Sequence, residues 1–380
     1  MENNNGNFQP VCMVRDIADG QSKAFTVTWG QEKIELAVFN LKGQFYAISN
    51  ICAHKGGPLS RGLLDGEIVT CPWHGWKYSV VDGRSPHEGG DSVNAYETLV
   101  LNGRIYVNPV PFRQGERTYK PHVKYAELES SVKEHLARID GAAGPGGDDV
   151  VKVLGISTTN VTERVERKST SEEALDFALD YAKGELGAQT VMVKLRELDF
   201  KHCQGYYSAD SKACIFPCSI SEADEKDQMI EIYRQIILWA DVVLISTPIR
   251  WGSASSLYYK MVQRMNSVQN QITARKTYLV RDKAAAFIIT GGQDNVQHVA
   301  GEMMSFWSQV GFVFGRSPFV GWSRGWYAED TENNYAGVRR DIQDHGSLKN
   351  DLMATVRGAV EMSRLVKKSR YDERVLLGRQ

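Results

Sequence analysis

Two short motifs, each pairing a cysteine with a histidine, constrain this sequence more than any other feature. Cys52-Ala53-His54 is followed, after a gap of sixteen residues, by Cys71-Pro72-Trp73-His74. Two thiolates and two imidazoles can surround one zinc ion tetrahedrally. They can also hold a [2Fe–2S] cluster, with the thiolates on one iron and the imidazoles on the other, which raises its reduction potential above that of an all-cysteine cluster. Glycines follow both motifs and let backbone N–H groups approach the sulfurs. We therefore favour the cluster and keep zinc as the alternative.

Around these motifs, residues 10–110 resemble a Rieske domain of the ferredoxin and aromatic-ring-oxygenase type. Rieske proteins of cytochrome complexes carry two further cysteines that form a disulfide, and those positions read Gly57 and Trp73 here. Trp76 stands where those proteins have a serine. The resemblance therefore implies a cluster without a neighbouring disulfide and with a potential near the low end of the Rieske range, about −150 mV. Its implied ligands are Cys52, His54, Cys71 and His74.

Length and composition bound the possible functions. The chain has 380 residues, of which 42% are hydrophobic, so we expect two or three domains with packed cores. The net charge of −1 provides no basic field for nucleic acid or an anionic membrane. No apolar run approaches the length of a membrane span, and the polar N-terminus lacks a signal-peptide pattern. We therefore predict a cytoplasmic protein that binds neither nucleic acid nor membrane.

The N-terminal part has the pattern of an all-β domain. Short runs rich in β-branched and aromatic residues alternate with turn residues. Predicted strands are Phe25–Trp29, Lys33–Phe39 and Gln44–Ser49, with a second hairpin of Ala95–Val100 and Arg104–Asn108.

Residues 111–149 connect this domain to a second one. Apolar spacing predicts a helix over Tyr125–Ile139, and the glycine-rich run from Asp140 to Asp148 has a linker composition. From residue 150 to 370, strands and helices alternate, which indicates a parallel sheet covered by helices on both faces.

The five strands expected in this second domain are Val150–Ile156, Thr190–Leu195, Asp241–Ser246, Ala284–Thr290 and Phe312–Phe319. The expected helices are Ser171–Gly187, Glu225–Trp239, Ala254–Ser267, Val296–Val310 and Asn350–Lys368. Such a chain suits a flavodoxin-like, doubly wound five-stranded parallel sheet of order 2-1-3-4-5. The predicted fold class is therefore multidomain: an all-β Rieske domain followed by this α/β domain.

In such a sheet a ligand lies beyond the carboxyl ends of the strands. Hydroxyl side chains gather after the first strand and directly before the next helix, where N–H groups can bind a phosphate. Simple helix capping is the alternative explanation. The sequence contains neither a GxGxxG fingerprint nor a P-loop in this place. The candidate phosphate residues are Ser157, Ser169, Thr170 and Ser171.

Two further loops could lie along a planar ring. A run after the third strand combines a proline-fixed backbone, which presents an arginine and a tryptophan, with small residues at the start of a helix, and the fourth strand ends in glycines that permit close backbone approach. The candidate ring-binding residues are Thr247, Pro248, Ile249, Arg250, Trp251, Gly252, Ser253, Thr290, Gly291 and Gly292.

Residues 150–370 resemble the flavodoxin-like, NAD(P)H-dependent FMN reductases. The run Thr247–Gly252 is similar to that family's Ser-Pro-x-Tyr-Trp-Gly segment, although Arg250 replaces its tyrosine, and Gly291-Gly292 matches the fourth-strand loop. The insertion Thr158–Lys168 interrupts the phosphate loop. The resemblance implies FMN, NADH or NADPH as the electron donor, and a homo-oligomer in which a second subunit completes the flavin pocket.

Three other features carry weaker expectations. Cys203, Cys214 and Cys218 are too few and too widely spaced for the [4Fe–4S] motif of iron–sulfur flavoproteins, so we expect buried thiols. Trp322-Ser323-Arg324-Gly325-Trp326 could cover a flavin or pack at a subunit contact. No two histidines beyond His87 have the spacing of the mononuclear iron site of an oxygenase α-subunit.

Taken together, these features predict an oxidoreductase that passes electrons from NAD(P)H through FMN to the cluster and on to an acceptor protein, such as an oxygenase. A flavin accepts two electrons and releases them singly, whereas a Rieske centre handles one at a time. No catalytic side chain is expected. The alternatives are a flavin-dependent reductase of a quinone, nitro compound or similar substrate, and a non-enzymatic electron carrier.

Overall fold

The computed structural model describes residues 7–141, 150–162, 168–291, 295–323, 332–344 and 346–369, and they form two compact units. The N-terminal unit comprises the chain up to Pro121 together with Gly205–Ala213. The C-terminal unit comprises His122–Gln204 and the chain from Cys214 onward. We call Gly205–Ala213 the strap. No sequence pattern predicted that this segment would belong to the N-terminal unit.

The N-terminal unit is all-β, as predicted. A six-stranded antiparallel sheet has the order β1-β9-β8-β4-β3-β2, and a three-stranded sheet has the order β5-β6-β7. The strands of the large sheet are β1 (Gln9–Met13), β2 (Ser22–Trp29), β3 (Glu32–Leu41), β4 (Gln44–Ser49), β8 (Ala95–Leu101) and β9 (Arg104–Arg113). Those of the small sheet are β5 (Leu63–Asp65), β6 (Ile68–Thr70) and β7 (Lys77–Ser79).

Two tight turns close the predicted hairpins. Lys42 and Gly43 have φ angles of 54° and 85°, and Asn102 and Gly103 have 50° and 73°. Two successive residues with positive φ make the turn whose twist matches antiparallel strands. Glycine adopts this conformation at no steric cost, and asparagine tolerates it better than most residues. These turns fix the register of both hairpins.

The C-terminal unit is built on a parallel sheet of order β11-β10-β12-β13-β14, which confirms the predicted order 2-1-3-4-5. Every residue of β12 and β13 is buried, as expected of strands covered on both faces. The strands are β10 (Lys152–Ser157), β11 (Gln189–Lys194), β12 (Val242–Pro248), β13 (Ala284–Gly291) and β14 (Val313–Ser323). Its helices are α1 (Val123–Gly141), α2 (Thr170–Leu186), α3 (Ser219–Ala223), α4 (Met229–Tyr233), α5 (Ser256–Arg275), α6 (Val296–Val310), α7 (Glu332–Gln343) and α8 (Ser347–Ser369).

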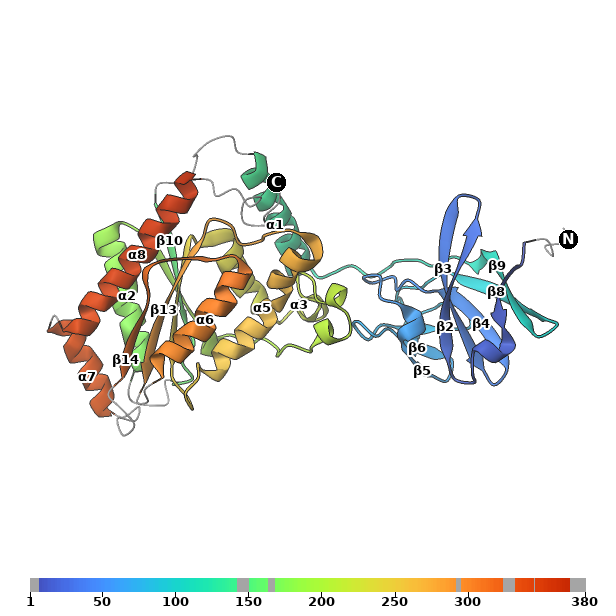
Figure 1. Cartoon of the computed structure of the whole chain (residues 1–380), viewed down its shortest axis with the longest axis horizontal. Coiled ribbons are helices and arrows are strands. Elements are labelled where there is room, and N and C mark those ends of the chain that lie inside the picture. Colours follow the sequence, from blue (N-terminus) through green and yellow to red (C-terminus); the bar gives the residue numbers. More distant parts are fainter. Residues whose placement is uncertain are drawn as a thin grey trace. The chain divides into compact units, whose positions relative to one another are not determined.

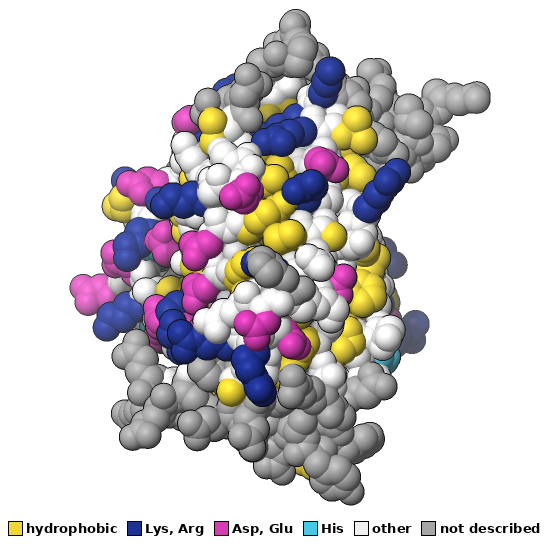
Figure 2. Space-filling model, turned by 90° about the vertical axis from the view of Figure 1, so that its left-hand side faces the viewer, with side chains coloured by type: hydrophobic (Ala, Val, Ile, Leu, Met, Phe, Trp, Pro, Cys, Tyr) yellow, Lys and Arg dark blue, Asp and Glu magenta, His cyan; other side chains and the backbone are white. Residues whose placement is uncertain are grey.

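Helices cover both faces of this sheet (Figure 1). Helices α2, α7 and α8 lie on one face, and α5 and α6 lie on the other. Leu175 of α2 and Val356 of α8 belong to the core cluster on the first face. Figure 2 shows the surface that lies on the left-hand side of Figure 1, where acidic and basic side chains are interspersed with hydrophobic ones. No described helix combines the length and the apolar character needed to cross a membrane.

The predicted helices differ from the observed ones in four places. The predicted helix Glu225–Trp239 begins only at Met229 and becomes a π-helical turn at Arg234–Trp239. Helix α5 continues eight residues beyond the predicted end, to Arg275, because Lys276 adopts a left-handed conformation and ends it there. The short helix α3 and the polar helix α7 were not predicted, since neither has a long apolar periodicity.

A buried ion pair fastens the long connection between β11 and β12 to α5. The side chains of Arg264, on α5, and Asp227, in the connection, are both 0% exposed, and their Nη2 and Oδ2 atoms are 2.7 Å apart. Arg264 also donates hydrogen bonds to the Ser221 hydroxyl and to the Lys201 carbonyl, at 2.7 and 2.8 Å. Lys201 and Ser221 stand on either side of the strap in sequence. One guanidinium therefore holds the connection both before and after the strap.

We predict that Asp227→Ala lowers the free energy of unfolding by about 3–5 kcal/mol, because it leaves the Arg264 guanidinium buried without its carboxylate. Urea titration measures this change. The matched control is Glu129→Ala, which breaks an exposed pair with Lys133 whose side chains are 43% and 72% exposed. The control should cost less than about 1 kcal/mol. Equal losses for the two variants would contradict a dominant role for the buried pair.

Candidate functional site

The two Cys/His motifs occupy loops with the same backbone hydrogen bonds. In the first loop, after β4, the Cys52 N–H donates to the Gly57 carbonyl at 3.0 Å, and the Gly56 N–H donates to the Cys52 carbonyl at 2.9 Å. In the second, between β6 and β7, the same two bonds join Cys71 to Trp76 and to Gly75. The glycine four residues after each cysteine has a φ of 80° or 76°, so the loop closes only because this position lacks a Cβ.

These loops bring thiol to thiol and imidazole to imidazole. The Cys52 and Cys71 thiols are hydrogen-bonded to each other and buried. The rings of His54 and His74 meet edge to face with centroids 4.8 Å apart. A single zinc ion would need its ligands around one point. Among the residues that the structure describes, no three His, Cys, Asp or Glu side chains are grouped to hold one ion. This arrangement suits two irons better than one zinc.

The surroundings of the thiols also fit a buried cluster. A Cβ on Gly57 would lie 2.7 Å from the Cys71 sulfur and 3.0 Å from the Trp73 ring, so the backbone approaches the sulfur where a side chain could not. The Tyr78 hydroxyl lies 3.3 Å from the Cys52 sulfur. The pKa of the Cys52 thiol is lowered to about 6, chiefly by the hydrogen bond from Cys71 and only partly offset by burial. Burial raises the pKa of Tyr78, which keeps its hydroxyl a donor.

Tyr78 was not predicted as a functional residue. The low potential was predicted from one position, where Trp76 stands in place of the serine of cytochrome-complex proteins. The Tyr78 side chain points inward from β7, and nothing in its local sequence indicates that its hydroxyl reaches a cysteine on another loop. A hydrogen bond to a cluster sulfur stabilises the reduced cluster and raises its potential. The low potential stays a prediction, and Tyr78 is a hydroxyl near the Cys52 sulfur that this prediction did not take into account.

Aromatic rings cover both histidines. Trp76 stacks on His54 with centroids 4.6 Å apart and an interplanar angle of 10°. Tyr119 meets Trp76 edge to face at 4.9 Å. On the other histidine, Tyr206 of the strap lies edge to face against His74 at 4.8 Å. The orientation of each imidazole is therefore fixed by packing as well as by its loop.

At the carboxyl edge of the parallel sheet, buried hydroxyl groups surround the first turn of α2. The hydroxyls of Ser169 and Ser171 lie 2.9 Å apart, and Thr170 lies 3.0 Å from the hydroxyl of Thr290 at the end of β13. Ser169 is the N-cap residue by position, but its hydroxyl bonds to Ser171 and not to the helix backbone. The Ser169 side chain therefore does not cap the helix. These hydroxyls line the positive end of a 17-residue helix dipole.

Ser157 reaches the same place, but Glu172 engages its hydroxyl. Ser157 donates to the Glu172 carboxylate at 3.0 Å. Glu172 also pairs with Arg196, in a short bidentate contact, and with Lys194 at 3.2 Å. Burial alone would raise the pKa of Glu172, but these partners lower it, so the carboxylate stays charged. We did not predict Glu172, Lys194 and Arg196 as site residues. The sequence of the second strand does not indicate which loop lies beside its carboxyl end.

The predicted ring loop divides into a buried part and an exposed tip. Thr247, Pro248 and Ile249 are buried, and the Ile249 N–H donates to the Thr290 carbonyl at 2.8 Å, which extends the pairing of β12 and β13. Strand β12 therefore ends two residues later than predicted. A Cβ on Gly291 would lie 2.9 Å from the Ile249 side chain, so this glycine is required for close packing. Gly292 lies outside the described residues.

The tip of this loop is a tight turn. Arg250 and Ser253 exchange backbone hydrogen bonds of 2.8 and 3.0 Å, with Trp251 and Gly252 between them at φ angles of 51° and 72°. The Trp251 side chain is 96% exposed. The Asn295 side chain, which sequence reasoning missed, donates to the Gly252 carbonyl at 2.5 Å. The turn thus presents an aromatic ring to solvent beside the carboxyl edge of the sheet.

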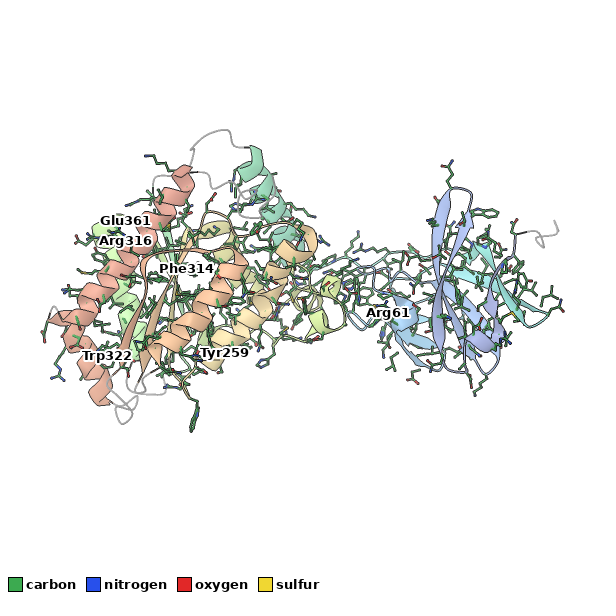
Figure 3. All side chains as sticks on the ribbon, viewed as in Figure 1. Arg61, Tyr259, Phe314, Arg316, Trp322 and Glu361 are labelled. Carbon is green, nitrogen blue, oxygen red and sulfur yellow. The ribbon has the colours of Figure 1, made fainter. Side chains whose placement is uncertain are left out.

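Figure 3 locates this edge: Trp322, near the end of β14, and Tyr259, in the first turn of α5, lie toward the same end of the sheet. Trp322 is buried in the core, and its ring N–H donates to Asp341 of α7 at 2.8 Å. Trp322 therefore packs within the chain itself, which differs from the two expected roles, covering a flavin and packing at a subunit contact. Arg324, Gly325 and Trp326 lie outside the described residues.

Of the three cysteines between β11 and β12, Cys214 and Cys218 are buried, as expected, whereas Cys203 is half-buried. Burial raises the pKa of Cys214 to about 11. Asn266 and Asn270, both on α5, donate to the sulfur and the carbonyl of Cys214 at 3.3 and 2.7 Å. Cys214 therefore anchors the chain directly after the strap.

Comparison with known proteins identifies two families. Residues 7–96 match the Rieske [2Fe-2S] domain, and residues 151–326 match the NADPH-dependent FMN reductases. Ferredoxin CarAc of Metapseudomonas resinovorans is 38% identical over 74 residues, which are 19% of this chain and 68% of that protein. The ferredoxin component of a naphthalene 1,2-dioxygenase system of Pseudomonas putida is 34% identical over 94 residues, 24% of this chain and 86% of that protein.

A longer match is to apoptosis-inducing factor 3 of Homo sapiens, which is 34% identical over 206 residues, or 51% of this chain. The chain spans only 31% of the length of that protein and of its mouse counterpart. The two ferredoxins are covered over more than two thirds of their length. The chain therefore belongs to the Rieske [2Fe–2S] ferredoxin family in its N-terminal part, and its C-terminal part matches the NADPH-dependent FMN reductases.

Proposed function

We propose that this oxidoreductase passes electrons from NAD(P)H through FMN to the Rieske cluster and on to an acceptor protein, such as an oxygenase component. The observation that carries the proposal is the presence, in one chain, of paired thiols and paired imidazoles on two loops and of a hydroxyl-lined helix start beside a ring loop. The similarity to ferredoxins named as parts of dioxygenase systems supports the kind of acceptor. The oligomer suggested by the family resemblance remains a proposal.

In this proposal Cys52 and Cys71 hold one iron, and His54 and His74 hold the other. When bound, the cluster accepts and releases single electrons at a potential raised by its two neutral ligands. The chain supplies the rest. Tyr78 donates toward the Cys52 sulfur, and Trp76 fixes the His54 ring by stacking. Because the two thiols are buried, water has little access to them. These contacts set the potential and limit movement of the ligands between oxidation states.

For FMN, we propose that Ser169, Thr170 and Ser171 bind the phosphate at the start of α2, close to Ser157. The ring would lie along the loop formed by Thr247, Pro248, Ile249, Arg250, Trp251, Gly252 and Ser253 and against the end of β13 at Thr290, Gly291 and Gly292. When bound, the flavin accepts a hydride and releases its electrons one at a time. No described side chain needs to act as an acid or base.

The cluster assignment predicts the effect of exchanging one ligand. His54→Cys should keep a [2Fe–2S] chromophore but lower its potential on the order of 100 mV or more, toward about −400 mV, because a thiolate adds negative charge. Redox titration followed by EPR measures the shift. Cys52→Ser, which removes a thiolate, should lose the cluster. An unchanged EPR signal and potential in the His54→Cys protein would show that His54 is not a ligand.

The ring loop predicts a loss of flavin. Gly252→Val should reduce the bound FMN at least tenfold, because a Cβ would lie 3.0 Å from Asn295 and valine disfavours the φ of 72°. The FMN content of the purified protein measures this loss. Gly301→Val is the matched control, since Gly301 of α6 has open space around it. Full FMN content in the Gly252→Val protein would exclude the loop from the flavin site.

The order of electron transfer tests the proposed function itself. Rapid mixing of the oxidised protein with NADPH or NADH, without an acceptor, should show bleaching of the flavin before loss of the cluster absorbance. The Cys71→Ser protein, which lacks a cluster ligand, should show the first phase and lack the second. A cluster that is reduced before the flavin, or stays oxidised after the flavin bleaches, would reverse or break the proposed chain. That outcome would favour a reductase of a small organic substrate at the flavin.

A further inference from the structure

A carboxylate of the N-terminal unit is completely buried close to the cluster site. Asp91 lies in the loop between β7 and β8 and is 0% exposed. Its Oδ1 atom accepts hydrogen bonds from the backbone N–H groups of Thr118 and Tyr119, both at 2.7 Å, and a longer one from the Thr118 hydroxyl at 3.4 Å. These donors are neutral groups, so they stabilise the negative charge of Asp91 without cancelling it.

The second oxygen of this carboxylate is buried as well. Among the residues that the structure describes, Oδ2 of Asp91 has no hydrogen-bond partner. A buried charge loses its hydration, which is costly where no partner replaces the lost water. The two backbone N–H groups need only one oxygen, and an asparagine would provide that oxygen too. The hydrogen bonds therefore explain the position of Oδ1, but they do not explain why this residue carries a charge.

Asp91 lies in the same buried region as the two thiols. Val93, two residues further along the chain, belongs to the core cluster that contains Cys52 and Cys71. The Tyr78 hydroxyl lies 3.3 Å from the Cys52 sulfur, and its pKa is raised by burial, by Cys52 and also by the negative charge of Asp91. The charge of Asp91 therefore acts on groups that contact a cluster sulfur.

Asp91 also holds the backbone that places an aromatic ring near one histidine. Tyr119 lies between β9 and α1, where the chain forms neither a helix nor a strand. Its ring faces that of His54 edge to face, with centroids 6.3 Å apart. The other histidine has a different neighbour, since the Ala213 carbonyl of the strap lies 2.9 Å from Nε2 of His74. Asp91 therefore supports the His54 side of the site.

The charge of the cluster determines the direction in which Asp91 shifts its potential. With two thiolates and two neutral imidazoles, the oxidised cluster is neutral overall, because the sulfides and thiolates balance two ferric ions. Reduction adds one negative charge. A nearby buried anion repels this charge, and the low dielectric of the interior strengthens the repulsion. Asp91 therefore disfavours the reduced cluster, whereas the Tyr78 hydroxyl favours it.

We propose that Asp91 sets the potential of the Rieske cluster: its buried charge lowers the potential, and its Oδ1 atom holds Tyr119 beside His54. The inference rests on the proposed cluster ligands and adds a positioning residue to them. One electron enters or leaves the cluster, no bond forms or breaks, and the carboxylate itself exchanges no electron. The lowered potential makes the reduced cluster a stronger electron donor toward its acceptor.

The test removes the charge and keeps the shape of the side chain. Asp91→Asn should still accept the N–H groups of Thr118 and Tyr119, so the cluster and its EPR signal should be retained. Redox titration with dithionite, followed by EPR, should show a higher potential. At the wild-type midpoint, the ratio of reduced to oxidised cluster should rise roughly threefold to tenfold. A tenfold rise corresponds to about 59 mV for a one-electron couple.

Two controls separate the charge from a merely structural role. Asp65→Asn removes the same charge from an exposed position of the same unit, where solvent screens it, and should leave the potential unchanged. Thr118→Val removes the hydroxyl that bonds to Asp91 and to the Gly89 carbonyl but keeps the buried charge. It should speed hydrogen exchange of the peptide that covers residues 114–121 without a comparable rise in potential.

Two results would overturn the proposal. One is a wild-type potential in the Asp91→Asn protein, and the other is an equal rise in the Thr118→Val protein. If Asp91→Asn binds no cluster, Asp91→Glu and Asp91→Gln repeat the comparison, because both add one methylene group and they differ in charge. The Gln protein should then have the higher potential, and equal potentials would contradict the proposal.

The titration does not depend on the proposed route of the electrons, because dithionite replaces NAD(P)H and FMN as the reductant. A wild-type cluster that NADPH never reduces would refute the proposed function, while the difference in potential between Asp91→Asn and the wild type would still support the role of Asp91. Failure of the proposed function and failure of this inference are therefore distinguishable results.

Discussion

The buried ion pair between Arg264 and Asp227 is the constraint on which the rest of the arrangement depends. Two charges with no solvent exposure lose their hydration, and such a pair adds little net stability compared with a well-packed apolar pair. Its role here is to fix the position of the connection between β11 and β12. Because Arg264 also binds the Lys201 carbonyl and the Ser221 hydroxyl, the connection can follow only one course past α5. The strap leaves and re-enters the C-terminal unit between these two fixed points.

The cluster site depends on local backbone geometry in a different way. Each ligand loop closes through the same pair of hydrogen bonds around its cysteine, and each needs a glycine with positive φ four residues later. The loops can therefore present a thiol and an imidazole in the same relative position twice. Two copies of one small turn, facing each other, bring thiol to thiol and imidazole to imidazole. This pairing of like side chains explains why two cysteines and two histidines, which together could bind one zinc ion, do not surround a single point.

Local patterns in the sequence predicted most of the fold, because most of it depends on interactions between residues that are close together in the sequence. The Asn-Gly turn, the alternation of strands and helices and the ligand spacing all act within a few residues, and they led to the correct sheet order. The strap could not be predicted in this way. His74 and Ala213 are 139 positions apart, and Gly205–Ala213 has no pattern that indicates its partner. Tyr78 and Arg196 were missed for the same reason, since each acts on a residue of another loop.

The electrostatics of the proposed phosphate site follow from one acidic residue. A carboxylate in the first turn of α2 interacts well with the helix dipole, but it would repel a phosphate bound there. Lys194 and Arg196 offset this effect. With Glu197, which pairs with both of them, two cations and two carboxylates leave a local charge of about zero, so the helix terminus, at about +0.5, supplies the positive potential. Glu172 in turn holds the Ser157 hydroxyl and both cations at the end of β10 and β11. Glu172 thus holds the hydrogen-bond donors of the proposed phosphate site in place, but it does not make the local charge there negative.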